Sequence, residues 1–500
     1  MLFAELVAAS DAVAATSRRT AKVQALAALL RALAPAEVEP AVDFLTGVPR
    51  QGKVGVGWST VFSLDVAPAS AATLAVLDVD RTLDVVLATT GPGSTAARQT
   101  VLGDLLGRAT EGEQSFLRRL LVGELRQGAL AGIMTDAVAA AAGVPVAAVR
   151  RAAMLSGDLG TAALVALTEG EPGVAGVGLR LLHPVLPMLA APAAGVPGAL
   201  DETGPASIEW KLDGARIQVH RQGDVVRIFT RNLNDVTERL PAVVSAVLAL
   251  PVPAVVLDGE AIGVDDEARP QAFQDTMSTF GSDAGGGLRA YFFDVLHADG
   301  DDLLDRPLAE RLDVLEAVAG PLRVPSLVTA DPAAATAFLG DALRHGHEGV
   351  VVKALDAPYD AGRRGGAWRK VKPVRTLDLV VLAAEWGHGR RQGWLSNLHL
   401  GARDPVTGGF VMVGKTFKGL TDALLAWQTE RLQALAVATD GLTVHVWPEL
   451  VVEIALDGAQ VSRRYPGGVA LRFARVRRYR DDRRPEEADT IEAVRALLPR

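Results

Sequence analysis

The sequence contains no cysteine among its 500 residues. This absence excludes disulfide bonds, zinc sites with cysteine ligands and iron–sulfur clusters. A chain without cysteine also fits a reducing compartment, so we expect the protein to be cytoplasmic.

Lysine is scarce as well. Only eight of the 51 basic residues are lysine, and the other 43 are arginine. A GC-rich coding sequence explains such a bias most simply, and lysine is then retained where arginine cannot replace it. The clearest such task is attack as a neutral amine, because a guanidinium stays protonated at any accessible pH. The eight are Lys22, Lys53, Lys211, Lys353, Lys370, Lys372, Lys415 and Lys418.

Long hydrophobic runs are also missing. The longest apolar stretch, residues 242–257, carries Pro251 and Pro253 and runs into Asp258 and Glu260. We therefore expect a helix end followed by a strand, and no membrane span. No basic segment follows Met1, so no secretory signal is expected. A hydrophobic content of 49% and a charged content of 22% predict a folded chain of about three domains, at roughly 150 residues each.

The net charge of −8 by itself disfavours a nucleic-acid partner. Two basic tracts near the C-terminus indicate the opposite. Residues 361–420 contain eleven Arg or Lys against three acids, and residues 463–480 contain seven Arg and no acid. These tracts predict phosphate binding on one surface, with a merely solvated basic face as the alternative.

The periodicity changes along the chain. Residues 1 to about 180 are rich in Ala and Leu with helical spacing, and we predict helices at 22–33, 113–130 and 144–155. A Pro- and Gly-rich stretch, residues 183–205, resembles a linker. Short strands separated by helices at 240–250 and 308–318 follow, and beyond residue 373 short strands suggest a small barrel. The predicted strands of the middle segment are 208–212, 216–220, 225–230, 254–257, 291–295 and 349–352.

Lys211 lies in the segment Glu209-Trp210-Lys211-Leu212-Asp213-Gly214-Ala215-Arg216. The spacing Lys-x-Asp-Gly-x-Arg resembles the active-site motif of covalent nucleotidyltransferases, which include DNA ligases, RNA ligases and mRNA capping enzymes. Taken alone, the same residues are equally compatible with a β-hairpin that has Asp-Gly in its turn.

Five further elements follow this segment in the order that such enzymes require. Each has a structural alternative, namely a solvated cap, a core aromatic pair or an exposed strand face. Their occurrence together, with half of the chain's lysines among them and Lys211, favours a catalytic site. They are Arg231, Asp258-Gly259-Glu260, Tyr291-Phe292-Phe293-Asp294, Glu348 to Lys353, and Trp368 to Lys372, in which Lys370 and Lys372 share one strand face.

Over essentially its whole length the chain resembles the ATP-dependent DNA ligases of the replicative and archaeal three-domain type. Leu186-Pro187-Met188-Leu189-Ala190 is similar to the segment before their catalytic domain, and residues 462–476 resemble their last motif. The Ala- and Arg-rich composition suggests an actinobacterial member. One departure is Arg480-Asp481-Asp482-Arg483, where the family usually ends in lysine.

The resemblance implies a multidomain fold. An all-α DNA-binding domain would occupy residues 1–182, and an α+β nucleotidyltransferase (adenylation) domain residues 183–372. A C-terminal β-barrel of the OB-fold type would occupy residues 373–500. The protein would be a monomer that encircles nicked double-stranded DNA in the nucleoid, during replication, repair or recombination. The sequence does not identify protein partners.

The resemblance also implies the site residues. Lys211 would attack the α-phosphate of ATP, and a metal ion with the nearby lysines would lower its pKa. Glu260 and Glu348 would hold Mg²⁺, which prefers oxygen ligands. Glu209 would contact adenine and Phe293 would stack on it. The remaining nucleotide contacts would be Arg216, Arg231, Glu260, Lys353, Arg364, Lys370 and Lys372, with Arg472 or Arg475 orienting pyrophosphate.

Three alternatives are weaker. NAD-dependent ligases carry a cysteine-ligated zinc module, which this chain cannot form. RNA ligases and capping enzymes share the lysine motif but not the long helical N-terminal region. A non-catalytic scaffold that binds nicks would not need to retain the lysines.

Overall fold

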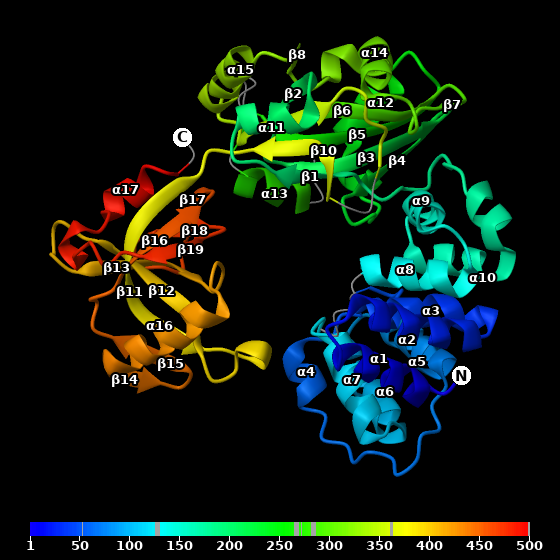
Figure 1. The fold of residues 1–500 in the computed structure, drawn as a ribbon, viewed down its shortest axis with the longest axis horizontal. Helices are drawn as coiled ribbons and strands as arrows, with labels where there is room; N and C mark the ends of the chain where they lie inside the picture. The colour runs from blue at the N-terminus through cyan, green and yellow to red at the C-terminus, as the bar shows by residue number, and fades with distance from the viewer. Residues whose placement is uncertain are drawn as a thin grey trace.

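The computed structural model describes residues 1–52, 54–125, 131–264, 270–271, 273–281, 287–360 and 364–498. Three lobes follow one another along an arc, with the helical N-terminal lobe and the β-rich C-terminal lobe at its two ends (Figure 1). The middle lobe contains helices and sheets and connects the other two.

The N-terminal lobe is built from helices α1 to α10 around one apolar core. Phe3 is fully buried in this core and contacts the rings of Phe44 and Phe116 edge to face. The helices are α1 Phe3–Ala14, α2 Arg19–Ala32, α3 Pro35–Thr46, α4 Trp58–Phe62, α5 Val76–Ala88, α6 Ser94–Arg108, α7 Glu111–Leu121, α8 Ala131–Ala142, α9 Val146–Ser156 and α10 Leu159–Gly176.

Helices predicted at 22–33 and 144–155 are confirmed as α2 and α9 within a few residues. The predicted helix at 113–130 is too long. It begins with a capping box between Thr110 and Glu113, and α7 ends at Leu121 because the chain turns at Gly123, whose φ is +71°. Residues 126–130 of that prediction lie outside the described residues.

In the described part of the chain, no single helix is long and apolar enough to span a membrane. Helices α8 and α9 meet that criterion only as a pair, and they are bent by 118°.

The middle lobe contains two five-stranded sheets, in the orders β1-β10-β9-β2-β8 and β4-β3-β5-β6-β7. The chain passes from the first sheet to the second at residues 212–214, between β2 and β3. The elements are β1 Leu189–Pro192, α11 Val196–Thr203, β2 Ala206–Lys211, β3 Ala215–Gln222, β4 Val225–Thr230, α12 Pro241–Leu248, β5 Ala254–Gly263, α13 Phe273–Gly281, β6 Leu288–Ala298, β7 Asp301–Asp302, α14 Leu308–Ala319, β8 Ser326–Thr329, α15 Pro332–Arg344, β9 Gly349–Ala354 and β10 Arg364–Val371.

All six strands predicted in this segment are confirmed, as are the two helices, now α12 and α14. The linker predicted at 183–205 is wrong. That stretch contains β1, which pairs in parallel with β10, and α11, which packs Val196, Ala199 and Leu200 into the core beneath the first sheet. Its Pro and Gly residues begin and end these short elements.

The C-terminal lobe is a β structure with two helices. Its seven-stranded sheet runs β13-β12-β11-β15-β14, and β16 pairs with both β11 and β19. The strand pairings among the described residues do not close this sheet into a barrel. The elements are β11 Arg375–Trp386, β12 Leu395–Arg403, β13 Phe410–Thr416, α16 Asp422–Ala434, β14 Ala436–Asp440, β15 Thr443–Val446, β16 Val451–Leu456, β17 Gly458–Val461, β18 Val469–Arg472, β19 Arg475–Tyr479 and α17 Ile491–Arg495.

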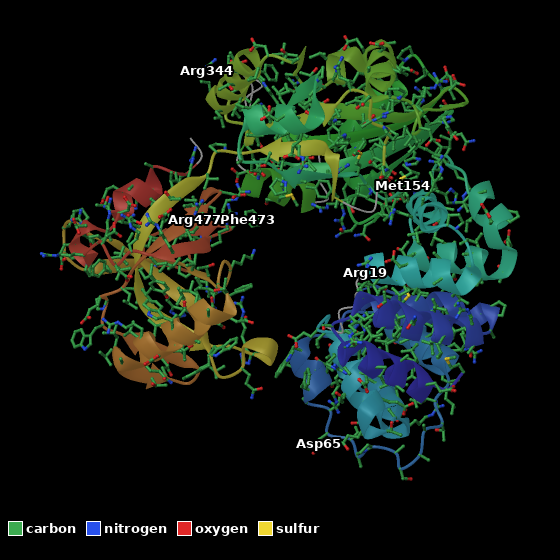
Figure 2. The ribbon with its side chains drawn as sticks, viewed as in Figure 1. Arg19, Asp65, Met154, Arg344, Phe473 and Arg477 are labelled. Carbon is green, nitrogen blue, oxygen red and sulfur yellow. The ribbon has the colours of Figure 1, made fainter. Side chains whose placement is uncertain are left out.

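Two junctions connect the lobes. At the first, Met154 and Leu155 of α9 belong to an apolar cluster with Val185, Val256 and Leu296, and Figure 2 shows Met154 where the helical lobe meets the middle lobe. At the second, only residues 372–374 separate β10 from β11. Strand β10 carries cavity residues, so this short connection brings the C-terminal lobe close to the site described next.

Candidate active site

Lys211 is the last residue of β2, and its ammonium forms an ion pair with Glu348. The two side chains meet because β2 and β9 are antiparallel and Lys211 lies opposite Gly349. The backbone supports the same contact, since the Glu348 amide donates to the Lys211 carbonyl at 3.1 Å. Lys372 donates to the other oxygen of Glu348 at 2.7 Å, so one carboxylate holds two lysines.

The acidic groups around Lys211 set its protonation. Burial lowers the pKa of the Lys211 amine, but the carboxylates of Glu348, Glu260 and Asp213 outweigh it, and the pKa is raised from its ordinary value. The expected lowering by neighbouring cations is therefore wrong for the side chains by themselves. The lysines near Lys211 are themselves neutralised, as the Lys372–Glu348 and Lys353–Glu209 pairs show.

One end of the site is buried and aromatic. The Lys353 ammonium pairs with Glu209 at 2.6 Å, donates to the Phe293 carbonyl at 2.8 Å and lies over the rings of Phe293 and Trp368. Ser207 donates to the second oxygen of Glu209 at 3.1 Å. Because this carboxylate is fully buried, its pKa is raised in spite of Lys353. Such a set of aromatic faces with a carboxylate acceptor suits a heterocyclic base.

Glycine at position 214 is a steric requirement of the turn after Lys211. A Cβ there would lie 2.3 Å from the carbonyl oxygen of Ala261, so no larger residue fits between the turn and β5. The Gly214 amide donates to Glu260 at 3.2 Å. Burial raises the pKa of Glu260 to about 7, even though Lys211 and Arg216 act in the opposite direction.

Arg216 is held by a network of its own. Its guanidinium binds both oxygens of Asp258, at 3.0 and 2.6 Å, and donates to the Met188 carbonyl at 2.7 Å. Tyr359 donates to Asp258 at 2.7 Å and accepts from the Met188 amide. This network connects β3 and β5 to Met188, the residue before β1, so Arg216 shapes the wall that it also lines.

The remaining predicted residues vary in their placement. Lys370 and Arg231 line the same cavity as Lys211. The backbone of Arg364 begins β10, but its side chain lies outside the described part of the structure. Asp294, which ends the aromatic motif, is fully buried against Arg311 and has a structural role, since this ion pair joins β6 to α14.

The C-terminal lobe completes the cavity. Arg472 donates to Asp213 at 2.9 Å, and Asp457 accepts from Lys372 at 3.3 Å. Lys418, Phe473 and Arg475 also line the cavity, and Figure 2 shows Phe473 on the C-terminal lobe. Sequence reasoning missed Asp457, Tyr359 and Lys418. Only Lys418 carried a usable signal, because it is one of the retained lysines.

The cavity measures about 770 Å³. Nine basic and five acidic side chains line it, which gives an excess of four positive charges within a protein of net charge −8. Five of the eight lysines in the chain are among them. The arrangement can therefore bind a polyanion and present an amine to it.

Two carboxylates in this cavity suit a magnesium ion. Glu348 pairs with the Lys211 ammonium, and Glu260, which accepts from the Gly214 amide, lines the same cavity. Within the described residues no cluster of three His, Asp or Glu side chains forms a metal cage. Proteins usually hold Mg²⁺ with one or two carboxylates together with the phosphates of a substrate, so Glu260 and Glu348 fit this ion.

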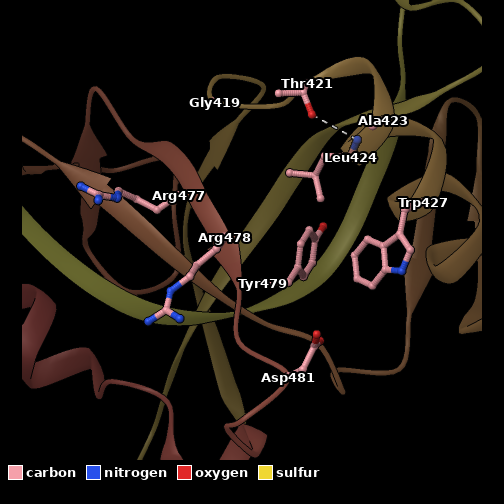
Figure 3. A pocket seen from close by; sticks show the side chains of 9 residues that line it. All are labelled: Gly419, Thr421, Ala423, Leu424, Trp427, Arg477, Arg478, Tyr479 and Asp481. Atoms are coloured by element: carbon pink, nitrogen blue, oxygen red, sulfur yellow. Dashed lines mark hydrogen bonds between the residues drawn. The ribbon is translucent and has the colours of Figure 1, made fainter.

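A second cavity of about 580 Å³ lies on the C-terminal lobe between α16 and β19. Figure 3 shows Trp427 beside Tyr479, whose rings are 4.7 Å apart, and Thr421 accepting from the Leu424 amide to cap the helix. Among its lining residues are two arginines and one carboxylate but no lysine, so it has no amine nucleophile.

Comparison with known proteins gives matches along the whole chain. Family models described as DNA ligase N terminus, ATP dependent DNA ligase domain and ATP dependent DNA ligase C terminal region match residues 59–139, 187–372 and 391–483. A probable DNA ligase of Anaeromyxobacter sp. is 57% identical over 100% of this chain and 98% of its own length. One of Rhodococcus opacus is 55% identical over the full length of both. The solved structure named Pmar-Lig_Pre covers 95% of this chain and 99% of its own, with a TM-score of 0.64 and 17% identity, a likeness of fold.

Proposed function

The chain belongs to the ATP-dependent DNA ligase family, and from that membership we propose that Lys211 is the residue that carries AMP. The observation that carries this proposal is the position of its amine. It lies in a cavity with a positive charge excess, between a buried aromatic end and the cations of the C-terminal lobe.

Adenine occupies the buried end in this proposal. Phe293 stacks on the base, and the Glu209 carboxylate, fixed by Lys353, accepts from its amino group. The phosphates extend past Lys211 toward Arg231, Lys370, Lys372 and, at the start of β10, Arg364. Arg216 holds the wall through Asp258 and contacts the nucleotide from there.

Ligases of this family use ATP and a divalent metal ion, and they seal nicked DNA through an adenylate intermediate. In this chain Glu260 and Glu348 would hold Mg²⁺, which neutralises charge on the reacting phosphates when bound. Lys211 loses one proton to solvent, attacks the α-phosphorus as the neutral amine and forms a P–N bond as pyrophosphate leaves, and the new P–N nitrogen releases a second proton to solvent. AMP then passes to the 5′-phosphate at the nick, and the 3′-hydroxyl attacks that phosphate and releases AMP.

The lobes would divide this work. Residues 1–182 would grip the duplex, residues 183–372 would carry the nucleotide, and residues 373–500 would form an OB-fold that closes on the cavity for ATP and moves away for DNA.

We propose a monomer that encircles the nick. A nick has no base sequence of its own, so contacts to the DNA phosphates would dominate binding. The affinity for nicked DNA would therefore fall steeply as the salt concentration rises. We also propose that the enzyme is cytoplasmic and associated with the nucleoid, which is consistent with the absence of cysteine from the chain.

The test is transfer of label from ATP that is radioactive in its α-phosphate. Lys211→Arg keeps the charge and the reach of the side chain and removes only its nucleophilicity, so the variant should take up no label. Lys415→Arg is the matched control, because Lys415 pairs with Glu385 outside the cavity and should label normally. Wild-type labelling of Lys211→Arg would contradict the proposal.

A further inference from the structure

Lys418 is a cavity lysine that none of the recognised motifs contains. The other four lysines that line the cavity come from the middle lobe, whereas Lys418 follows β13 in the C-terminal lobe. The chain has 43 arginines and only eight lysines, and the roles proposed above do not explain why position 418 is a lysine.

The backbone around Lys418 is fixed to β19. The Thr416 hydroxyl donates to the Ala474 carbonyl at 2.6 Å, and the Val476 amide donates to the Lys418 carbonyl at 2.9 Å. Gly419 has a φ of +84°, and a Cβ there would lie 2.1 Å from the Val476 carbonyl oxygen. Only glycine allows this approach, so the segment that carries Lys418 forms one rigid unit with residues 474–476.

The side chain of Lys418 is directed to the cavity by an aromatic ring. Its ammonium lies 5.7 Å from the centroid of Phe473, a half-exposed residue held at a φ of +54°, and the Arg472 guanidinium lies over the same ring at 5.9 Å. In the described part of the chain no carboxylate pairs with Lys418, unlike Lys211, Lys353 and Lys372. Its charge is therefore available to an anion.

The position of Lys418 along the cavity follows from its neighbours. Arg472 binds Asp213, two residues beyond Lys211, and the aromatic end with Glu209 and Lys353 lies on the middle lobe. The C-terminal cations thus border the end of the cavity that lies away from the base. The β- and γ-phosphates lie at the end of ATP opposite its base, and they leave together as pyrophosphate when the α-phosphorus is attacked in line.

We propose that Lys418 binds the β- and γ-phosphates of ATP and stabilises them as they leave as pyrophosphate. This inference rests on the proposed function. The P–N bond forms between Lys211 and the α-phosphorus, the bond from that phosphorus to the bridging oxygen breaks, and the bridging oxygen leaves with pyrophosphate. A compact ammonium at that oxygen offsets the developing negative charge. The reverse reaction, attack of pyrophosphate on lysyl-AMP to restore ATP, uses the same contact.

The reverse reaction provides the test. Full-length enzyme carrying labelled AMP is mixed with increasing inorganic pyrophosphate, and the formation of ATP is followed. Lys418→Ala should raise the half-saturating pyrophosphate concentration about tenfold, the value of one hydrogen bond to a charged group. Lys418→Arg keeps the charge but should recover only part of this loss, because the larger guanidinium does not place one compact charge at the bridging oxygen. Lys415→Ala, three residues away and paired with Glu385 outside the cavity, should match the wild type.

Sealing of nicked DNA that already carries AMP on its 5′-phosphate separates this role from a structural one, because that step involves no pyrophosphate. If Lys418 binds pyrophosphate, Lys418→Ala should lose more of its response to pyrophosphate than of its rate of sealing. Equal losses in both, or a wild-type response of Lys418→Ala to pyrophosphate, would overturn it. A wild-type enzyme that takes no AMP from ATP would instead overturn the proposed function, so the two failures are distinct.

Discussion

The Lys211–Glu348 ion pair has two consequences for the reaction. It holds the amine at the cavity wall, and it stabilises the protonated form, which cannot attack phosphorus. Glu348 also binds Lys372, so any cation or phosphate that enters the cavity competes for groups in one connected network. In the proposed mechanism, loading of ATP must therefore rearrange these partners before the Lys211 amine can react.

A buried carboxyl group in the helical lobe gives a prediction at the residue scale. Burial, and then the nearby Asp158, Glu39 and Asp80, raise the pKa of Asp43 to about 8, against the opposing effect of Arg50. The folded state thus binds a proton that the unfolded state loses near pH 4. Stability should fall as pH rises from about 4 to 8, by at most about 1.4 kcal/mol per pH unit from this group.

Asp43→Asn should remove that contribution. Thermal denaturation at pH 5.5 and pH 8 should show a smaller loss of melting temperature for the variant than for the wild type. Identical pH dependence in the two proteins would show that Asp43 ionises normally in the fold.

At the same scale, the sequence predicted which residue types gather but not their partners. The order of the motifs and the scarcity of lysine together identified Lys211, Lys353, Lys370 and Lys372, and the structure brings all four to one cavity. The pairing of Lys353 with Glu209 depends on the register of β9 against β2, which no local pattern encodes. Asp457 could not be found at all, since its partner Lys372 belongs to another lobe.

The turn between β2 and β3 is the element on which the site depends most. It joins the two sheets of the middle lobe, lies against β5 through Gly214 and carries Asp213 to Arg472. The Lys-x-Asp-Gly pattern thus has a packing reason as well as a chemical one: the glycine lets the turn approach β5, and the approach aligns Glu260 with Lys211.

Gly214→Ala should disturb this alignment. A methyl group 2.3 Å from the Ala261 carbonyl forces the turn away from β5 and lengthens the hydrogen bond from residue 214 to Glu260. We expect at least a tenfold slower uptake of AMP, since about 1.4 kcal/mol of lost alignment is sufficient. Gly223→Ala, in an open turn where a Cβ meets no neighbour, is the comparison, though its φ of +60° costs some stability. Normal AMP uptake by Gly214→Ala would show that the close approach is not needed.

Elements of the middle lobe were predictable because each strand is a short apolar run that ends in charge or glycine. The errors came from tertiary contacts that override composition. Residues 183–205 have the composition of a linker, yet β1 gains a partner in β10. In the C-terminal lobe the order of the strands depends on long-range pairing, such as that of β11 with β16, which periodicity does not report.

On the scale of the whole molecule, two ion pairs of opposite polarity hold the C-terminal lobe on the middle lobe. Arg472 reaches Asp213, and Lys372 reaches Asp457. The two residues of the C-terminal lobe are adjacent in space, because the Asp457 amide donates to the Arg472 carbonyl at 3.0 Å. This contact closes the cavity over Lys211, as the ATP-loading arrangement proposed above requires.

Asp457→Asn should therefore weaken closure. A partly exposed ion pair contributes about 0.2–1 kcal/mol, so the rate of AMP uptake should fall by up to about fivefold. The loss should shrink as salt is added, because salt screens the wild-type pair. Asp440→Asn, at an exposed position of β14, serves as the control. An unchanged or faster rate for Asp457→Asn would mean that the pair does not assist loading.

The most direct test of the account is to identify the residue that carries AMP. Wild-type enzyme incubated with ATP and Mg²⁺ is digested and its peptides are analysed by mass spectrometry. We predict a single AMP adduct, on the lysine of the segment Ile208-Glu209-Trp210-Lys211-Leu212-Asp213. An adduct on any other residue, with Lys211 unmodified, would contradict the assignment on which the mechanism depends.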